Sequence, residues 1–208
     1  EARPGPIVDT LLGIASRTGA VVIGGGMPEV VPGDARRTYN TAVVVAPGRG
    51  VIGRYRKLHL FDVDIPGQVS IRESDTRVRG ADTVVARTEL GVIGLSVCYD
   101  LRFPELYRRL ARDGAEIVCL PSAFTFPTGA AHWEVLIRAR AIENQVYVVA
   151  ADQFGKSPGG FNDYGHSLIV DPWGTVLAEG GEGEGDAAAW LDPAVVAKVR
   201  ASLPSLAH

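Results

Sequence analysis

The sequence predicts a mixed α/β protein in which helices and sheets pack in layers. Strand-like apolar runs alternate with helix-like segments in the middle of the chain, and elsewhere they pair as hairpins. No internal repeat and no linker-like stretch interrupts the 208 residues. We therefore expect one domain over residues 1–208.

The first half is predicted to open with a helix over residues 5–18, where apolar residues recur at helical spacing and Gly19 is a stop signal. A turn at 47–50 between two apolar runs predicts a hairpin. The remaining expectations are strands over 20–24, 40–46 and 51–57, a loop over 28–38, and a long irregular segment from Leu58 to about Asp82.

In the second half, Pro104 is placed to open a helix that ends at Gly114. Further helices are expected over 130–144 and 193–202, and a Gly/Ser/Pro loop over 155–164. Strands are expected over 83–88, 92–97, 116–120, 147–151, 167–170, 175–179 and 187–191.

Composition excludes several functional classes. Apolar residues make up 46% of the chain and charged residues 22%, as in ordinary globular proteins. A net charge of −3 gives no electrostatic footprint for nucleic acid, and no apolar stretch is long enough for a membrane span. The two cysteines, Cys98 and Cys119, follow strand-like runs outside any metal-binding spacing, which predicts a reducing, cytoplasmic setting and no metal.

Cys98 is the first candidate for chemistry because it ends an apolar strand and precedes a helix that starts at Pro104. A nucleophile at such a turn is exposed at the sheet edge, and the backbone N–H of the next residue, Tyr99, can stabilise an oxyanion. Sulfur is a good nucleophile even when partly ionised. The alternative is a small buried side chain, which is the commoner role of a free cysteine and the one we expect for Cys119.

Lys57 and Glu73 are the next candidates. Lys57 closes the strand over 51–57, and ligand sites form at strand ends of α/β sheets. Glu73 lies deep in the long irregular segment, and loops of that length are often functional. Taken singly, each is also explained as a solvated surface charge.

Three histidines, His59, His132 and His166, are possible bases or ligands. No two of them have metal spacing on one element, so hydrogen-bonded structural roles are expected. One alternative mechanism nevertheless remains open, a Cys–His hydrolase or transferase in which His132 or His166 activates Cys98.

Four blocks of sequence, in order, resemble the nitrilase superfamily of carbon–nitrogen hydrolases. They are Tyr-Arg-Lys-Leu-His-Leu-Phe at 55–61, Gly-Leu-Ser-Val-Cys-Tyr-Asp-Leu-Arg-Phe-Pro-Glu-Leu at 94–106, the helix segment from Ala131 to Asn144, and Tyr164 to Gly174. The segment Phe61–Gly67 with Glu73-Ser74 is similar to the omega-amidase and deaminated glutathione amidase branch.

The resemblance implies an α-β-β-α sandwich that dimerises or forms a larger homo-oligomer, with Lys57, Cys98 and Glu73 matching family catalytic positions. A further family glutamate, the general base, has no match, because Glu1 lies too close to the first helix and Glu29 belongs to a different position. On this basis the chain is expected to lack the family's first strands and to stop early at its C-terminus.

The activity implied is hydrolysis of a small primary amide, such as the ω-amide of a 2-oxo acid or deaminated glutathione, through a cysteine thioester and without a cofactor. Lys57 and the Tyr99 N–H would form the oxyanion hole, and Phe124 and Thr128, in the loop after the strand over 116–120, would line the substrate pocket. Two alternatives are an N-carbamoyl amide hydrolase and an inactive scaffold fragment that lacks the base.

Overall fold

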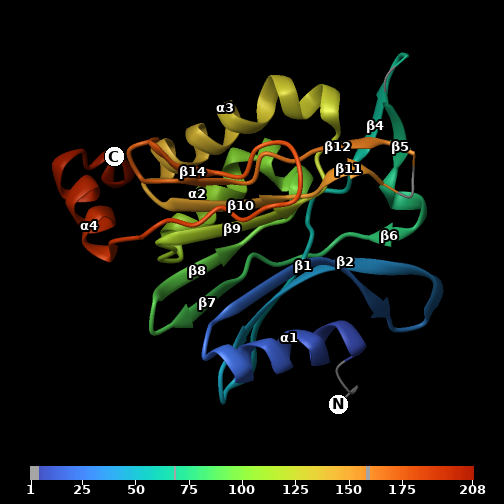
Figure 1. The fold of residues 1–208 in the computed structure, drawn as a ribbon, viewed down its shortest axis with the longest axis horizontal. Helices are drawn as coiled ribbons and strands as arrows, with labels where there is room; N and C mark the ends of the chain where they lie inside the picture. The colour runs from blue at the N-terminus through green and yellow to red at the C-terminus, as the bar shows by residue number, and fades with distance from the viewer. Residues whose placement is uncertain (1–4, 68, 158–159) are drawn as a thin grey trace.

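Two β-sheets lie face to face with helices on their outer sides in a computed structural model, which describes residues 5–67, 69–157 and 160–208. In Figure 1 the layers run from α1, through the sheet of β1 and β2, to the sheet of β7–β10, and then to α2 and α3. The predicted α-β-β-α sandwich is therefore confirmed.

The first sheet is built around β2 (Asp34–Ala46), which pairs with β1 (Val22–Val31), β3 (Gly50–Arg56) and β6 (Arg77–Val78). Helix α1 (Pro6–Thr18) covers its outer face. Successive side chains of β2 face opposite sides, so Val43 and Val45 pack in the cluster with Ala15 of α1, while Ala42 and Val44 join the core with the second sheet. Burial on both faces explains why residues 40–46 are almost uniformly apolar.

The second sheet has the order β14-β13-β10-β9-β8-β7. Its strands are β7 (Val85–Thr88), β8 (Gly91–Leu95), β9 (Ile117–Ser122), β10 (Tyr147–Asp152), β13 (Leu168–Val170) and β14 (Val176–Glu179). Strands β8, β9 and β10 are parallel, and α2 (Pro104–Arg112) and α3 (Phe126–Asn144) connect them along the outer face. The carboxyl ends of these three strands meet at one edge, which is where α/β sheets place ligand sites.

Several predicted loops prove to be hairpins. The prediction of a loop over 28–38 is wrong, because β1 and β2 continue through this segment. The chain turns between them at Gly33, whose φ of +80° suits glycine. The segment 58–82 contains β4 (Asp62–Ile65), β5 (Val69–Arg72), the 3₁₀ turn η1 (Glu73–Asp75) and β6, and 155–164 contains parts of β11 (Phe154–Lys156) and β12 (Asn162–Tyr164). These strands are only two to four residues long. The alternation of β4 (Asp-Val-Asp-Ile) and β5 (Val-Ser-Ile-Arg) is therefore at the lower limit for a strand signal in the sequence.

The C-terminal segment differs from expectation in one strand. The strand predicted over 187–191 is wrong, because these residues pair with no strand and Trp190 among them is 92% exposed. Helix α4 (Pro193–Ser202) follows as predicted, and the Asp192 side chain caps it by accepting from the Ala194 N–H. A last 3₁₀ turn, η3, spans Ser205–Ala207.

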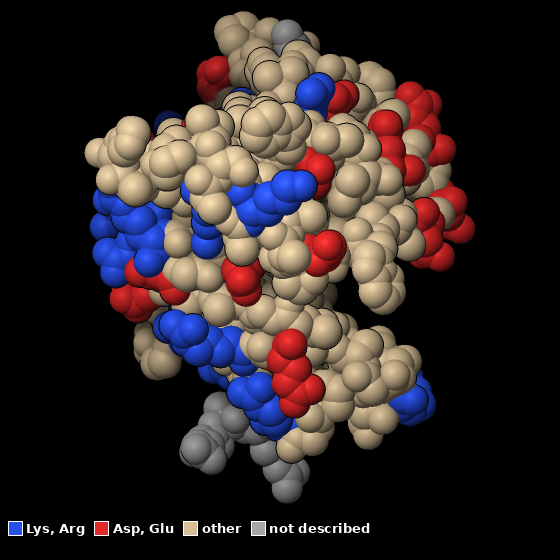
Figure 2. All heavy atoms as spheres, turned by 90° about the vertical axis from the view of Figure 1, so that its left-hand side faces the viewer, with Lys and Arg blue, Asp and Glu red and all other residues tan. Residues whose placement is uncertain are grey.

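Surface charge is mixed on the face drawn in Figure 2. Lys and Arg gather in separate groups on one side and below, with acidic side chains between them, and a further acidic group lies on the other side. Among the described residues, no helix is both long and apolar enough to cross a membrane.

Candidate active site

Cys98 lies where the buried end of β8 turns into the 3₁₀ helix η2 (Cys98–Arg102), just before α2. Its φ of +48° is unusual for a residue other than glycine, and such strained conformations concentrate at functional sites. The thiol Sγ lies 3.7 Å from the carbonyl oxygen of Ala123, which follows the end of β9. The side chain is half-buried, so the predicted turn presents the sulfur to a cavity instead of enclosing it in the core.

Lys57 and Glu73 form a tight ion pair beside this turn. Lys57 directly follows β3 and is 2% exposed, and its Nζ lies 2.6 Å from Glu73 Oε2. The carboxylate also accepts from the Asn40 side-chain amide at 3.0 Å and from the Phe61 backbone N–H at 2.7 Å. The pair therefore fixes the end of β3 to the long segment that precedes β7.

A buried carboxylate, Asp100, holds the cysteine turn and the lysine segment together. It accepts hydrogen bonds from the Tyr55 hydroxyl at 2.7 Å, the Val97 N–H at 2.9 Å and the His59 N–H at 3.1 Å. The His59 Nδ1 lies 2.7 Å from the same carboxylate, and the His59 ring stacks on Phe103. Asp100 thus binds the residues that flank Lys57 and the residue that precedes Cys98, and so it positions both side chains. The sequence did not reveal this link.

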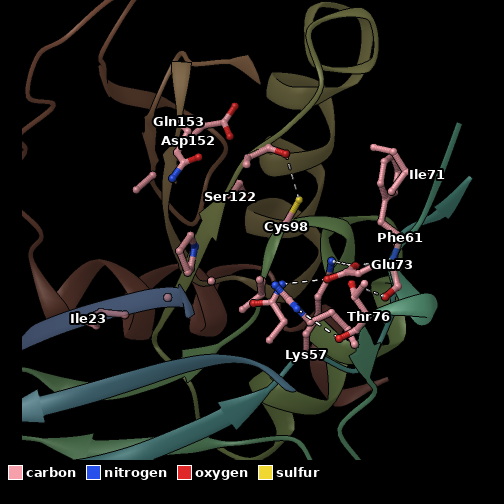
Figure 3. A pocket seen from close by; sticks show the side chains of 18 of the residues that line it. Ile23, Lys57, Phe61, Ile71, Glu73, Thr76, Cys98, Ser122, Asp152 and Gln153 are labelled. Atoms are coloured by element: carbon pink, nitrogen blue, oxygen red, sulfur yellow. Dashed lines mark hydrogen bonds and ion pairs between the residues drawn. The ribbon is translucent and has the colours of Figure 1, made fainter. Parts of the chain in front are cut away.

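Cys98, Lys57 and Glu73 all line one open cavity of about 650 Å³. Figure 3 shows Glu73, Phe61, Ile71 and Thr76 on one side of the thiol, and Ser122, Asp152 and Gln153 on the other. We call the first side the Glu73 wall and the second the Asp152 wall. The three predicted catalytic side chains are therefore brought to a common space.

Protonation differs among the groups in this cavity. Burial raises the pKa of the Cys98 thiol, although the Lys57 ammonium works against it. Burial would also raise the pKa of Glu73, but Lys57, together with the Asn40 and Phe61 donors, outweighs it and holds that pKa below its usual range. The thiol is therefore protonated at neutral pH while Glu73 is ionised, so attack by the sulfur requires a base.

Asp152, at the end of β10, is a lining residue that sequence reasoning missed. Burial raises its pKa to about 8, and the charge of Asp163 adds to the rise. One carboxyl oxygen accepts from the Phe124 N–H at 2.8 Å, while Oδ2 has no hydrogen-bond partner among the described residues. Its place directly after the strand predicted over 147–151 is the signal that could have found it, as for Lys57, whereas its burial and its partner come from other elements.

The predicted oxyanion donor and pocket residues lie close to the thiol. The first hydrogen bond of η2 runs from the Asp100 N–H to the Val97 carbonyl. The Tyr99 N–H lies one residue before that donor, at the start of the turn, next to Cys98. Phe124 and Thr128 are buried and line a recess of about 20 Å³ beside Cys98, outside the lining of the large cavity. Thr128 belongs to the first turn of α3, so placing it in a loop was wrong.

The remaining candidates are accounted for elsewhere. No histidine is among the described residues that line the large cavity: His59 pairs with Asp100, His132 contacts Arg102, and His166 lies 2.7 Å from Glu179. The Cys–His alternative therefore finds no support. Glu29 lies inside β1 and pairs with Arg56, and Glu1 is outside the described residues. Within the described part of the chain, no cluster of three or more His, Cys, Asp or Glu side chains is arranged to hold a metal ion.

Comparison with known proteins shows the family of this chain. The model of the carbon–nitrogen hydrolase family matches residues 1–201. The chain belongs to the carbon–nitrogen hydrolase family. Members of this family are enzymes. Two of the similar proteins described next are named as amidases, and yeast Nit3 is described as a member of the nitrilase superfamily.

Deaminated glutathione amidase of Synechocystis is 45% identical over 94% of this chain and 72% of its own length. The omega-amidase NIT3 of Saccharomyces cerevisiae is 40% identical over 97% of this chain and 69% of its own, and the yeast Nit3 crystal structure matches with a TM-score of 0.86. The crystal structure of the Caenorhabditis elegans NitFhit protein matches with a TM-score of 0.91 and 40% identity, covering 98% of this chain and 50% of the worm chain.

Proposed function

We propose that this carbon–nitrogen hydrolase cleaves a small primary amide to a carboxylate and ammonia, with Cys98 as the nucleophile. The observation that carries the proposal is the meeting of a strained, accessible thiol with the buried Lys57–Glu73 pair in one cavity. Neither feature alone indicates hydrolysis. Together they supply a nucleophile and a fixed positive charge for the oxygen of one carbonyl.

In the first step, the Cys98 sulfur bonds to the amide carbon while its proton goes to a general base, the role that the family resemblance gives to the glutamate without a match in this chain. Negative charge then develops on the carbonyl oxygen, where the Lys57 ammonium and the Tyr99 N–H stabilise it. The C–N bond breaks, the nitrogen takes up the proton and leaves as ammonia, and a thioester remains. Water then attacks the thioester, which releases the acid and restores the thiol.

Glu73 has an orienting role in this proposal. Its carboxylate accepts from Lys57, Asn40 and the Phe61 N–H, so it is held as an anion that aims the ammonium into the cavity. The only other carboxyl group among the described lining residues is Asp152, which is mainly protonated at pH 7 and bound to the Phe124 N–H. We assign the general base to neither of them.

The substrate class follows the names of the relatives. We propose the ω-amide of a 2-oxo acid or deaminated glutathione, because the similar proteins are named omega-amidase and deaminated glutathione amidase. An N-carbamoyl amide hydrolase, the second candidate, would use the same three residues and differ in the rest of the pocket. It would release carbon dioxide as well as ammonia.

The test measures ammonia from α-ketoglutaramate, deaminated glutathione and an N-carbamoyl amine, side by side. Cys98→Ala should abolish release and should block a thioester adduct seen by mass spectrometry. Cys119→Ala is the matched control, since Cys119 lies buried in β9 and should leave release unchanged. Turnover that survives Cys98→Ala contradicts the proposal, and a carbon dioxide product places the enzyme with the N-carbamoyl hydrolases.

We also propose a homo-oligomer in a reducing, cytoplasmic setting. Exposed apolar side chains at the C-terminal end, Trp190 at 92% and Leu203 at 52%, support a contact surface between copies. The free thiols of Cys98 and Cys119 support the reducing setting. Light scattering during size-exclusion chromatography tests the first point, and a monomer at micromolar concentration contradicts it.

A further inference from the structure

We propose that Arg72 and Arg77 form an anion subsite on the Glu73 wall, which selects amides that carry a carboxylate away from the reacting amide. This inference rests on the proposed function and deepens it, because it assigns residues to substrate selection. Arg72 ends β5 and Arg77 begins β6, so the two arginines flank the turn that carries Glu73. Both line the cavity that contains Cys98.

The charges lining the cavity favour an anion. Lys57 and Glu73 neutralise each other at 2.6 Å. Besides the Cys98 thiol, whose raised pKa keeps it neutral, this leaves Arg72, Arg77 and Asp152 as the other charged or titratable lining groups among the described residues. Asp152 is mainly protonated at pH 7, since burial raises its pKa to about 8. Even with Asp152 ionised, two arginines exceed one carboxylate. The cavity is therefore positive although the whole chain carries a net charge of −3.

Both guanidinium groups retain donors for a ligand. Arg77 Nη1 donates to the Thr76 carbonyl at 3.3 Å, and neither arginine makes an ion pair within the described parts of the chain. Arg72 lies across from Asp62 in the β4–β5 hairpin and helps to lower the pKa of that exposed carboxyl, so it is near a charge without being bound to it. Arg77 is half-buried, which limits the positions its side chain can take.

The chemistry of arginine fits a carboxylate. A guanidinium presents a planar fork of N–H donors that matches two carboxylate oxygens, and it stays charged at every working pH. The Lys57–Glu73 pair ties this wall to the reacting centre, so a carboxylate held there and an amide carbonyl at Lys57 define a substrate with two polar ends. A neutral amide of the same length would lack the first contact.

Alkylation of Cys98 tests the subsite without requiring hydrolysis. Iodoacetate and iodoacetamide deliver the same carbon to the thiol, but only iodoacetate brings a carboxylate. The two rates are measured at pH 8 for the unaltered chain, for Arg72→Gln, for Arg77→Gln and for the double variant, with peptide mass spectrometry assigning the label to Cys98 over the buried Cys119. Arg79→Gln is the matched control, because Arg79 is an exposed arginine two residues beyond Arg77 that lines a separate recess.

Each single change should lower the iodoacetate rate about threefold and the double change about tenfold, while the iodoacetamide rate stays constant. The Arg79→Gln rates should match the unaltered chain. An unchanged ratio with Cys98 labelled overturns the subsite and leaves the proposed hydrolase standing. An equal loss in Arg79→Gln also overturns it, since the effect is then general surface charge. If neither reagent labels Cys98, the nucleophile assignment fails and the subsite fails with it.

Discussion

The two walls of the cavity carry carboxyl groups of opposite behaviour. Glu73 is largely buried beside a lysine and accepts two further hydrogen bonds, so its pKa falls. Asp152 is half-buried. Among the described residues it pairs with no cation and its Oδ2 has no hydrogen-bond partner, so its pKa rises to about 8. Burial acts in the same direction on both groups, and the partner decides the result. At pH 7 the carboxyl group of the Glu73 wall is therefore ionised and that of the Asp152 wall is mainly neutral, on opposite sides of the Cys98 thiol.

Because of this difference, the two walls have different roles in the proposed reaction. An ion pair at the Glu73 wall supplies a fixed positive charge where an oxyanion develops. A neutral group at the Asp152 wall adds no negative charge beside a thiol that must lose its proton. Hydrogen bonding from the Phe124 N–H also ties that wall to Ala123, whose carbonyl contacts Cys98. The following changes test whether this division holds.

Removing the cation should have the largest effect. Lys57→Met should lower amide hydrolysis about a hundredfold to a thousandfold, because the oxyanion loses a positioned donor. It should also slow iodoacetamide alkylation of Cys98 at pH 8, since the ammonium counteracts the rise in the thiol pKa. Initial rates of ammonia release and of alkylation measure the two effects. Lys156→Met, at an exposed lysine on β11, is the control, and near-normal turnover in Lys57→Met would remove lysine from the mechanism.

Neutralising the partner should have the next largest effect. Glu73→Gln keeps the shape of the side chain but leaves the buried Lys57 ammonium without its counter-charge. We expect the free energy of unfolding to fall by about 2 kcal/mol, below the usual loss for a broken buried pair because Glu73 remains partly exposed. Urea denaturation at pH 7 measures this. Equal stability of Glu73→Gln and the unaltered chain would show that the pair adds nothing to the fold.

Sequence reasoning found the residues that belong to local patterns and missed those that depend on distant partners. Cys98 follows an apolar strand and precedes a proline-initiated helix, so its turn was predictable. Lys57 marks a strand end in the same way. Asp152 also follows a predicted strand, but its burial and its Phe124 partner were not predictable, because they come from the packing of separate elements. The β4–β5 hairpin was missed although its strands alternate as Asp-Val-Asp-Ile and Val-Ser-Ile-Arg, because each run is only four residues long, at the lower limit for a strand signal.

The last expected effect lies at Asp152 and depends on pH. Its folded pKa of about 8 lies above the ordinary 3.8, so between these values the folded chain binds a proton that the unfolded chain has lost. Stability therefore falls as pH rises from about 4 to 8. Asp152→Asn retains an acceptor for the Phe124 N–H and cannot ionise, so it should stabilise the chain at pH 8 and change little at pH 4. Melting temperatures across this range test the sign, with the exposed Asp186→Asn as control; a variant that is less stable at pH 8 would mean that the Asp152 wall holds a charge after all.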